Sequence, residues 1–217
     1  MAFSSAWEHL YASGQHMSVW PWSDLISLVV RYAPRSARLR VLELGVGAGA
    51  NIPFFLSMGC EYYGIEGSSK AVETLRERFS GQATIAAGDF CDEIPFSETF
   101  DLIVDRASMT HNDLPGIKSA LNNAGACLKA GGLFVGVTWF STDCSLFTKG
   151  MPTDDFYVRR DFKEGFLANT GIVHFGDQER IFSIFKKFQI KHIEHRITDI
   201  IVPSPERIAA WNIVAQK

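Results

Sequence analysis

The length, composition and charge of the chain limit its possible functions. Its 217 residues suffice for one domain with a full hydrophobic core but are few for two. Hydrophobic residues make up 47% and charged residues 21% of the chain, as is usual for a globular protein. The net charge of −3 gives no general basic face for nucleic acid. We therefore expect a single domain, residues 1–217, without a nucleic-acid partner.

The sequence near the amino terminus does not predict export or membrane insertion. Residues 1–8 contain no basic segment followed by an apolar one, and the apolar run Leu25–Val30 is too short to span a bilayer. The four cysteines show no paired spacing, so we expect free thiols. These features favour a cytoplasmic protein without a membrane anchor.

Hydrophobic periodicity predicts a doubly wound α/β fold. Two helices, residues 3–12 and 23–33, come first and form a helical cap over residues 1–35. Strands and helices then alternate from 39 to 139. This alternation predicts a mostly parallel sheet in a core of residues 36–140.

The rest of the chain breaks the alternation. Residues 141–176 lack periodicity and follow a strand, so we expect them to form an acceptor lid with Met17–Trp22, mobile until ligand binds. The last unit, residues 177–217, should begin with an amphipathic helix in which Phe182 is among the inward-facing residues. Two closing antiparallel strands should follow, over residues 189–198 and 207–216.

A glycine turn after the first strand is the most informative motif. Gly45, Gly47 and Gly49 alternate between the apolar strand Val41–Leu44 and a helical pattern that begins near Asn51. A strand, a glycine turn and a helix start bring a nucleotide-like ligand against bare backbone. Glu66, at the end of the next strand, can accept hydrogen bonds from ribose hydroxyls.

The charge of Glu43 separates two possible ligands for this turn. The glycines also fit a dinucleotide fingerprint, but a carboxylate two residues before Gly45 would repel a pyrophosphate. S-adenosylmethionine has no phosphate and carries a sulfonium and an ammonium, which Glu43 would favour. Asp89 and Phe90 follow a third strand, where an acid can accept from an adenine amino group and a ring can cover adenine.

The ordered set Glu43–Gly49, Glu66, Asp89, Asp105–His111 and Gly131–Gly132 resembles class I S-adenosylmethionine-dependent methyltransferases. The resemblance implies a Rossmann-like fold with seven strands and an antiparallel carboxyl-terminal pair. It also points to a bacterial subgroup that is often linked to surface polysaccharide or sugar modification. The expected cofactor-binding residues are Glu43, Gly45, Gly47, Gly49, Asn51, Glu66, Gly67, Ser68, Asp89, Phe90 and Arg106.

Two residues after the fourth strand are candidates for catalysis. His111 can take a proton from an attacking hydroxyl, although it could instead cap a helix or bond Asp105 or Asn112. Arg106 could bind an anionic substrate or simply pair with a neighbouring aspartate.

Other candidates for the acceptor site lie outside this core. They are Trp20, Arg159, Arg160 and His174, each of which could equally have a structural role. His192 and His195 point to opposite faces of a strand, and no other cluster has ligand spacing, so we expect no metal.

These patterns predict methyl transfer from S-adenosylmethionine to a small acceptor, with a hydroxyl of a sugar or related metabolite as the expected target. One alternative is an NAD(P)-dependent reductase, which Glu43 and the lack of a Tyr-x-x-x-Lys pair after the fourth or fifth strand disfavour. Another is a protein that binds the cofactor and serves as a non-catalytic partner.

Overall fold

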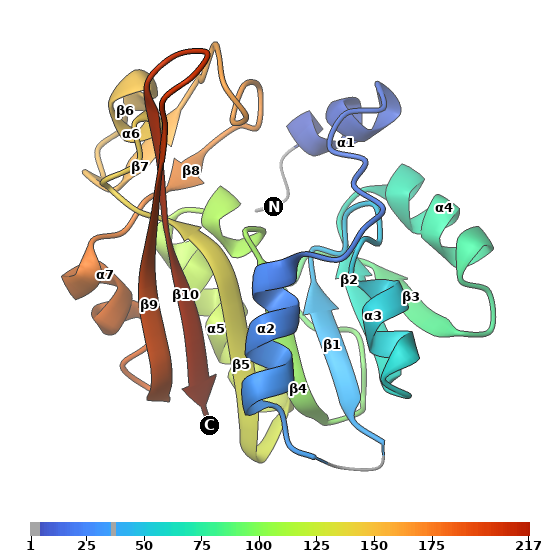
Figure 1. Cartoon of the computed structure of the whole chain (residues 1–217). Coiled ribbons are helices and arrows are strands. Elements are labelled where there is room, and N and C mark those ends of the chain that lie inside the picture. The colour runs from blue at the N-terminus through green and yellow to red at the C-terminus, as the bar shows by residue number, and fades with distance from the viewer. Residues whose placement is uncertain (1–4, 36–37) are drawn as a thin grey trace.

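A seven-stranded sheet forms the centre of the computed structural model, which describes residues 5–35 and 38–217 (Figure 1). The strand order is β3-β2-β1-β4-β5-β10-β9. Neighbouring strands from β3 to β5 run parallel, whereas β10 runs antiparallel to both β5 and β9. The strands are β1 (Arg40–Leu44), β2 (Glu61–Glu66), β3 (Ala83–Ala87), β4 (Phe100–Arg106), β5 (Leu128–Phe140), β9 (Gln189–Ile200) and β10 (Glu206–Gln216). The expected doubly wound fold is confirmed.

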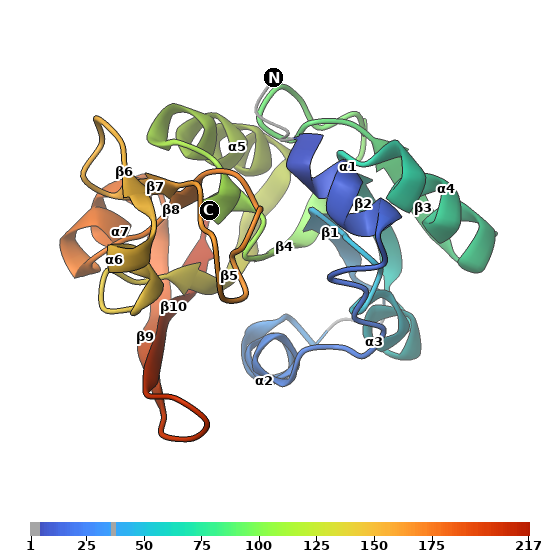
Figure 2. The ribbon, with the colours of Figure 1, turned by 90° about the horizontal axis from the view of Figure 1, so that it is seen from above.

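Helices cover both faces of the sheet, as Figure 2 shows from above. On one face, α2 (Ser23–Tyr32), α3 (Ile52–Ser57) and α4 (Ser69–Arg78) contribute buried side chains to one hydrophobic cluster. On the other face, α5 (Leu114–Cys127) and α7 (Gln178–Ile184) pack in a second cluster. Strand β1 is apolar on both faces because it lies between these two layers, and Val41, Leu42 and Leu44 are completely buried.

The first helix, α1 (Ser5–Ala12), lies above the sheet, near the carboxyl ends of the parallel strands (Figure 1). Residues 3 and 4 of the expected helix lie outside the described residues. A short 3-10 helix, η1 (Met109–His111), follows β4 at the same edge. Parallel strands in a doubly wound fold bind ligands at this edge, where the strand order changes direction between β1 and β4.

Residues 141–176 are more regular than the sequence predicts. They contain α6 (Leu146–Lys149) and a second sheet of β6 (Met151–Pro152), β7 (Val158–Arg160) and β8 (Val173–His174). Phenylalanines from this segment form a core of their own, which Phe147, Phe162 and Phe175 share. Aromatic packing between irregularly spaced positions explains why periodicity did not reveal this small sheet.

The expectation for the last helix was wrong at one residue. Phe182 is 44% exposed, whereas Ile181, Ile184 and Phe185 are buried as predicted. The helix ends at Ile184, so its narrow apolar stripe leaves Phe182 on the outer face. All four cysteines are free. Within residues 5–35 and 38–217, no helix has the length and hydrophobicity needed to cross a bilayer.

Candidate functional site

A cavity of about 600 Å³ lies at the carboxyl edge of the sheet, within the size range of ligand pockets. Its floor comes from the segments that follow β1, β2, β3 and β4, and its walls come from α1, residues 16–22 and residues 166–170. The floor residues include Glu43, Gly45, Gly47, Asn51, Glu66, Gly67, Asp89, Phe90, Arg106 and His111. Ten of the expected site residues therefore meet in one space.

Two of the three glycines line this cavity. Gly45 and Gly47 have φ values of 68° and 58°, a region that favours glycine. A Cβ on Gly47 would lie 3.1 Å from the Tyr11 hydroxyl, and one on Gly45 would collide with the side chain of Ser108. Gly49 has a different role, because a Cβ there would lie 2.5 Å from Cδ2 of Leu75. Gly49 lets α4 pack against the turn.

The Glu43 carboxylate is buried, and each of its oxygens accepts one hydrogen bond. It accepts from Nδ2 of Asn51 at 2.7 Å and from the hydroxyl of Tyr62 at 2.5 Å. Asn51 in turn accepts from the backbone N–H of Trp22 at 3.2 Å, which ties the segment before α2 to the site. Burial raises the pKa of Glu43 to about 7.

Glu66 links the glycine turn to the start of α4. Its carboxylate accepts from the backbone N–H of Gly47 at 2.8 Å and from that of Ser68 at 2.9 Å. Burial raises its pKa. Ser68 is itself buried outside the cavity lining, and its hydroxyl caps α4 by accepting from the N–H of Ala71 at 3.1 Å. Ser68 therefore holds the Glu66 carboxylate in position but does not line the cavity itself.

The Asp105 carboxylate fixes the turn that carries Arg106 and His111. It accepts from Nε1 of Trp139 at 2.7 Å, from the N–H of Met109 at 3.0 Å, and from the N–H and hydroxyl of Ser108. Burial raises the pKa of Asp105 to about 6 despite these bonds.

The Arg106 side chain lies over an aromatic ring. Its guanidinium carbon is 3.4 Å from the ring centroid of Trp22. Its Nε is buried and has no hydrogen-bond partner in the described part of the chain. Burial lowers the pKa of Arg106, and the negative charges of Asp24, Glu43 and Asp105 oppose that effect.

His111 lies between two aromatic rings at the end of η1. Its ring centroid is 4.8 Å from that of Trp7 and 6.2 Å from that of Phe140, with edge-on geometry in both cases. Its Nδ1 is buried and lacks a hydrogen-bond partner among the described residues. Burial lowers the pKa of His111 to about 4, so the ring is neutral at pH 7.

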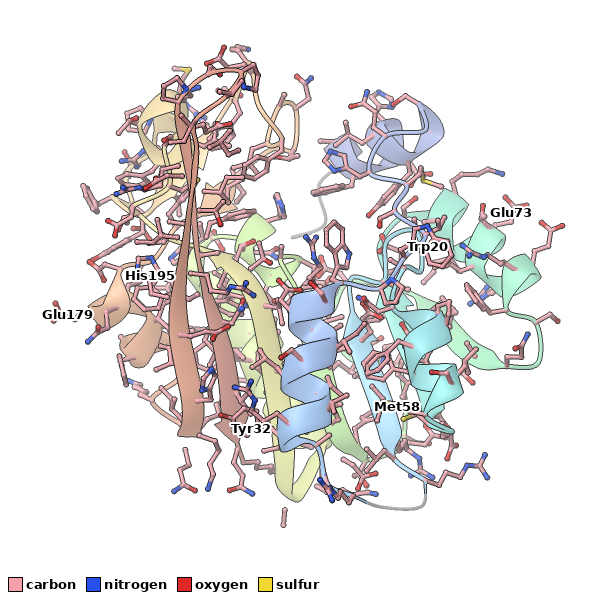
Figure 3. The ribbon with its side chains drawn as sticks, in the orientation of Figure 1. Trp20, Tyr32, Met58, Glu73, Glu179 and His195 are labelled. Carbon is pink, nitrogen blue, oxygen red and sulfur yellow. The ribbon has the colours of Figure 1, made fainter. Side chains whose placement is uncertain are left out.

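Four expected acceptor residues lie elsewhere. Trp20 is 78% exposed on the loop between α1 and α2 and does not line the cavity (Figure 3). Arg159 and Arg160 are on β7, and His174 is on β8, where the small sheet rather than the cavity surrounds them. Arginine and histidine side chains can form hydrogen bonds within the fold as readily as with a ligand. The sequence does not distinguish these two roles.

The contacts of these three residues explain their structural role. Arg159 is buried and donates to the carbonyl oxygens of Phe147 at 3.0 Å and Phe156 at 2.7 Å. Arg160 lies at the surface with its Nε 3.6 Å from the carboxylate of Asp161. Buried His174 accepts a hydrogen bond from Nε of Arg180 at 3.1 Å. None of these side chains lines the cavity.

Sequence reasoning missed most of the cavity walls. These residues are mainly aromatic or aliphatic and come from α1, β5, residues 166–170 and β10: Trp7, Tyr11, Phe140, Phe166, Leu167, Thr170 and Ile208. Trp7 and Tyr11 are four residues apart and share a helix face, a signal the sequence offered. The other residues are brought together only by tertiary structure. No group of three or more His, Cys, Asp or Glu side chains among the described residues could hold a metal ion.

Comparisons with known proteins agree with this geometry. Residues 41–132 match the family model of a methyltransferase domain. No curated protein sequence matches the chain significantly. The fold is similar to a solved S-adenosylmethionine-dependent methyltransferase from Methanosarcina mazei, with a TM-score of 0.70 and 18% identity over 87% of this chain and 96% of that one.

Two further solved structures share the fold. TehB from Haemophilus influenzae has a TM-score of 0.64 and 16% identity, over 97% of this chain and 67% of that one. An S-adenosylmethionine-dependent methyltransferase from Mesorhizobium loti has a TM-score of 0.61 and 18% identity, over 88% of this chain and 96% of that one.

Proposed function

We propose that this chain is a class I S-adenosylmethionine-dependent methyltransferase that methylates a hydroxyl group of a small molecule held beside His111. One observation carries the proposal. His111 lines the cavity, and its Nδ1 atom is buried without a hydrogen-bond partner among the described residues. A buried nitrogen of this kind is costly unless a ligand supplies its partner.

The residues of the cavity fit S-adenosylmethionine. Glu66 has lone pairs left to accept from ribose hydroxyls, and Asp89 and Phe90 suit the adenine. Gly45 and Gly47 line the cavity without side chains, which leaves space beside the turn for the methionine part.

The remaining expected cofactor residues support these contacts. Glu43 favours a cationic ligand, while Asn51 and Gly67 line the same wall. Gly49 and Ser68 act from outside the cavity, through the packing and capping of α4.

For methyl transfer from a sulfonium, the protein has to align the acceptor with the methyl group and remove the proton of the acceptor hydroxyl. When bound, S-adenosylmethionine supplies a methyl group that is activated by its sulfonium. Trp7 and Phe140 hold the His111 ring edge-on and keep water from it. Neutral His111 accepts the hydroxyl proton at Nδ1 as the acceptor oxygen becomes nucleophilic. Asp105 acts at a distance, by holding the turn on which His111 lies.

A labelling screen tests this function directly. Purified protein is incubated with methyl-labelled S-adenosylmethionine and fractionated metabolite extracts, and labelled products are identified by mass. The sequence resemblance puts sugars and related metabolites first among the fractions to be examined. We expect an O-methylated product whose formation falls strongly in His111→Ala. Cofactor binding without any labelled product would favour a non-catalytic partner, and binding of NAD in place of S-adenosylhomocysteine would favour a reductase.

A further inference from the structure

Aromatic rings dominate the part of the cavity around His111. The ring of Phe140 lies 5.9 Å from that of Phe166 and 6.2 Å from that of His111, which in turn lies 4.8 Å from Trp7. These rings come from four separate segments, and Leu167 and Ile208 add aliphatic surface beside them. In Figures 1 and 2, α1 and the small sheet lie at opposite sides of this edge. The chain therefore builds an apolar chamber from distant parts of the sequence.

Two polar side chains in this chamber are already engaged with the protein. The hydroxyl of Thr170 donates to the carbonyl of Leu167 at 2.7 Å. Nδ2 of Asn112 donates to the carbonyl of Met109 at 3.2 Å, and its Oδ1 lies 3.5 Å from Sγ of Cys91. A sugar presents hydroxyl groups on most sides, and each of them needs a partner once it is buried. The lining supplies few partners and favours a flat, apolar body.

Arg106 adds a positive charge to this chamber, and a purely apolar ligand would leave that charge without a partner. It forms no ion pair within the described ranges, although it lines the cavity and its Nε is buried without a partner. Three carboxylates act on its charge, those of Asp24, Glu43 and Asp105. All three accept hydrogen bonds from other groups, and Asp24 accepts from the N–H of Leu25 at 2.8 Å and from the hydroxyl of Thr138 at 3.4 Å. A half-buried guanidinium suits a planar carboxylate, which it can bind through two parallel hydrogen bonds.

We infer that the acceptor is an aromatic hydroxy acid, with its ring among Trp7, Phe140 and Phe166, its carboxylate on Arg106 and its hydroxyl on His111. This inference rests on the proposed methyl transfer to a hydroxyl group. It names an acceptor class that differs from the sugar implied by the resemblance. Trp22 contributes by holding the guanidinium over its ring, with Cζ 3.4 Å from the ring centroid.

Binding measurements on protein saturated with S-adenosylhomocysteine test the acceptor class. We would titrate para-hydroxybenzoate, phenol and glucuronate by calorimetry. Phenol keeps the ring and lacks the carboxylate, whereas glucuronate keeps the carboxylate on a sugar. We expect para-hydroxybenzoate to bind at least about tenfold more tightly than either, since it alone uses both features. Equal binding of all three probes, or tightest binding of glucuronate, would overturn the inference.

Two variants test whether Arg106 binds the carboxylate of the acceptor. In Arg106→Gln, the preference for para-hydroxybenzoate over phenol should disappear, while affinity for S-adenosylhomocysteine changes by less than about threefold. Arg160→Gln removes an exposed arginine outside the cavity and should change neither quantity. If Arg106→Gln instead weakens S-adenosylhomocysteine and keeps the preference, Arg106 binds the methionine carboxylate and the inference is wrong.

Turnover separates this inference from the proposed function. The same probes are incubated with methyl-labelled S-adenosylmethionine. If para-hydroxybenzoate binds with the expected preference but no O-methylated product forms, methyl transfer to a hydroxyl is wrong while the binding class stands. If a sugar fraction yields the labelled product and para-hydroxybenzoate does not bind, the function stands and the aromatic acceptor is wrong.

Discussion

The indole Nε1 of Trp139 donates a 2.7 Å hydrogen bond to the buried carboxylate of Asp105. Trp139 lies in the interior of β5, and Asp105 is the residue before the end of β4, near the turn that carries His111. The bond therefore joins the hydrophobic core to the reactive edge of the sheet. It also gives the buried Asp105 carboxylate a charge-assisted hydrogen bond. Loss of this bond should therefore lower the free energy of unfolding.

Removing this donor should destabilise the fold. Trp139→Phe keeps an aromatic ring but leaves one oxygen of Asp105 without its donor, so we expect the free energy of unfolding to fall by about 2–4 kcal/mol. Denaturant unfolding measures the change. Trp20→Phe alters an exposed tryptophan and should stay within about 0.5 kcal/mol of wild type. Similar stability of both variants would show that the Asp105–Trp139 bond contributes little.

The glycine turn provides a test of cofactor placement. Gly47 has a φ of 58° beside the Tyr11 hydroxyl, so valine there combines backbone strain with a side chain that enters the cavity. We expect Gly47→Val to abolish S-adenosylhomocysteine binding in calorimetry. Gly59 is a matched control, because its φ is 72° and a Cβ there meets no atom within 4 Å. Gly59→Val should lower stability yet bind normally, and wild-type affinity in Gly47→Val would contradict the placement.

The sheet and the floor of the cavity could be predicted because short-range patterns encode them. Central parallel strands are apolar on both faces, and residues that follow such strands must meet at one edge. The order of residues along the chain was therefore enough to assign Glu43 and Glu66 to one site. The partners of Glu43 could not be predicted, since Tyr62 reaches it from the neighbouring strand and Asn51 from a later helix start.

The walls of the cavity depend on tertiary packing that the sequence does not reveal. Arg159 and His174 looked like ligand contacts because charged and titratable residues in a loop often are. The structure instead gives them carbonyl oxygens and Arg180 as partners inside the small sheet. Trp7 and Phe140 lie far apart in the sequence, and the structure brings both rings to His111.

The buried Glu43 carboxylate should make stability depend on pH. Burial raises its pKa from 4.5 to about 7, so the folded protein holds a proton that the unfolded chain releases between these values. Its contribution is therefore fully present below about pH 4.5 and is lost as the pH rises through 7. Subtracting the unfolding free energy of Glu43→Gln from that of wild type at each pH isolates this group. The difference should fall from pH 4.5 to 7, and a flat difference would contradict the raised pKa.

The pH dependence of turnover tests His111 as the base. A histidine with an ordinary pKa would lose activity below about pH 6.5, whereas burial lowers the pKa of His111 to about 4. The neutral ring of His111 is the active form. Its ionisation should therefore leave kcat/KM unchanged from about pH 5 to 8 and should lower kcat/KM only toward pH 4.

Replacement of His111 completes that test. His111→Ala should reduce single-turnover methyl transfer by roughly 10²–10⁴ and leave affinity for S-adenosylhomocysteine nearly unchanged. A variant that reacts within a few-fold of wild type, with chemistry limiting the rate, would exclude His111 as the base. A loss of cofactor affinity in place of rate would instead give His111 a role in binding.

The small sheet changes what is expected of the lid. Backbone N–H groups of Phe175 and Gly176 donate 2.8 Å hydrogen bonds to the carbonyls of Tyr157 and Phe140, and both residues are buried. Their amides should exchange slowly in the free protein, so the sheet itself is not the moving part. Residues 16–22 belong to no helix or strand, and they line the cavity through His16, Met17, Ser18 and Trp22.

We therefore predict that the segment before α2, residues 13–22, closes over the site when ligand binds. Hydrogen exchange followed by mass spectrometry should show residues 13–22 slowing markedly when S-adenosylhomocysteine and an acceptor bind together. Peptides covering β7 and β8 should change little, because their exchange is limited by unfolding of the small core. The opposite pattern, fast exchange in β7 and β8 that ligand slows, would restore residues 141–176 as the moving lid. Unchanged exchange in both segments would mean that the acceptor enters without a moving cover.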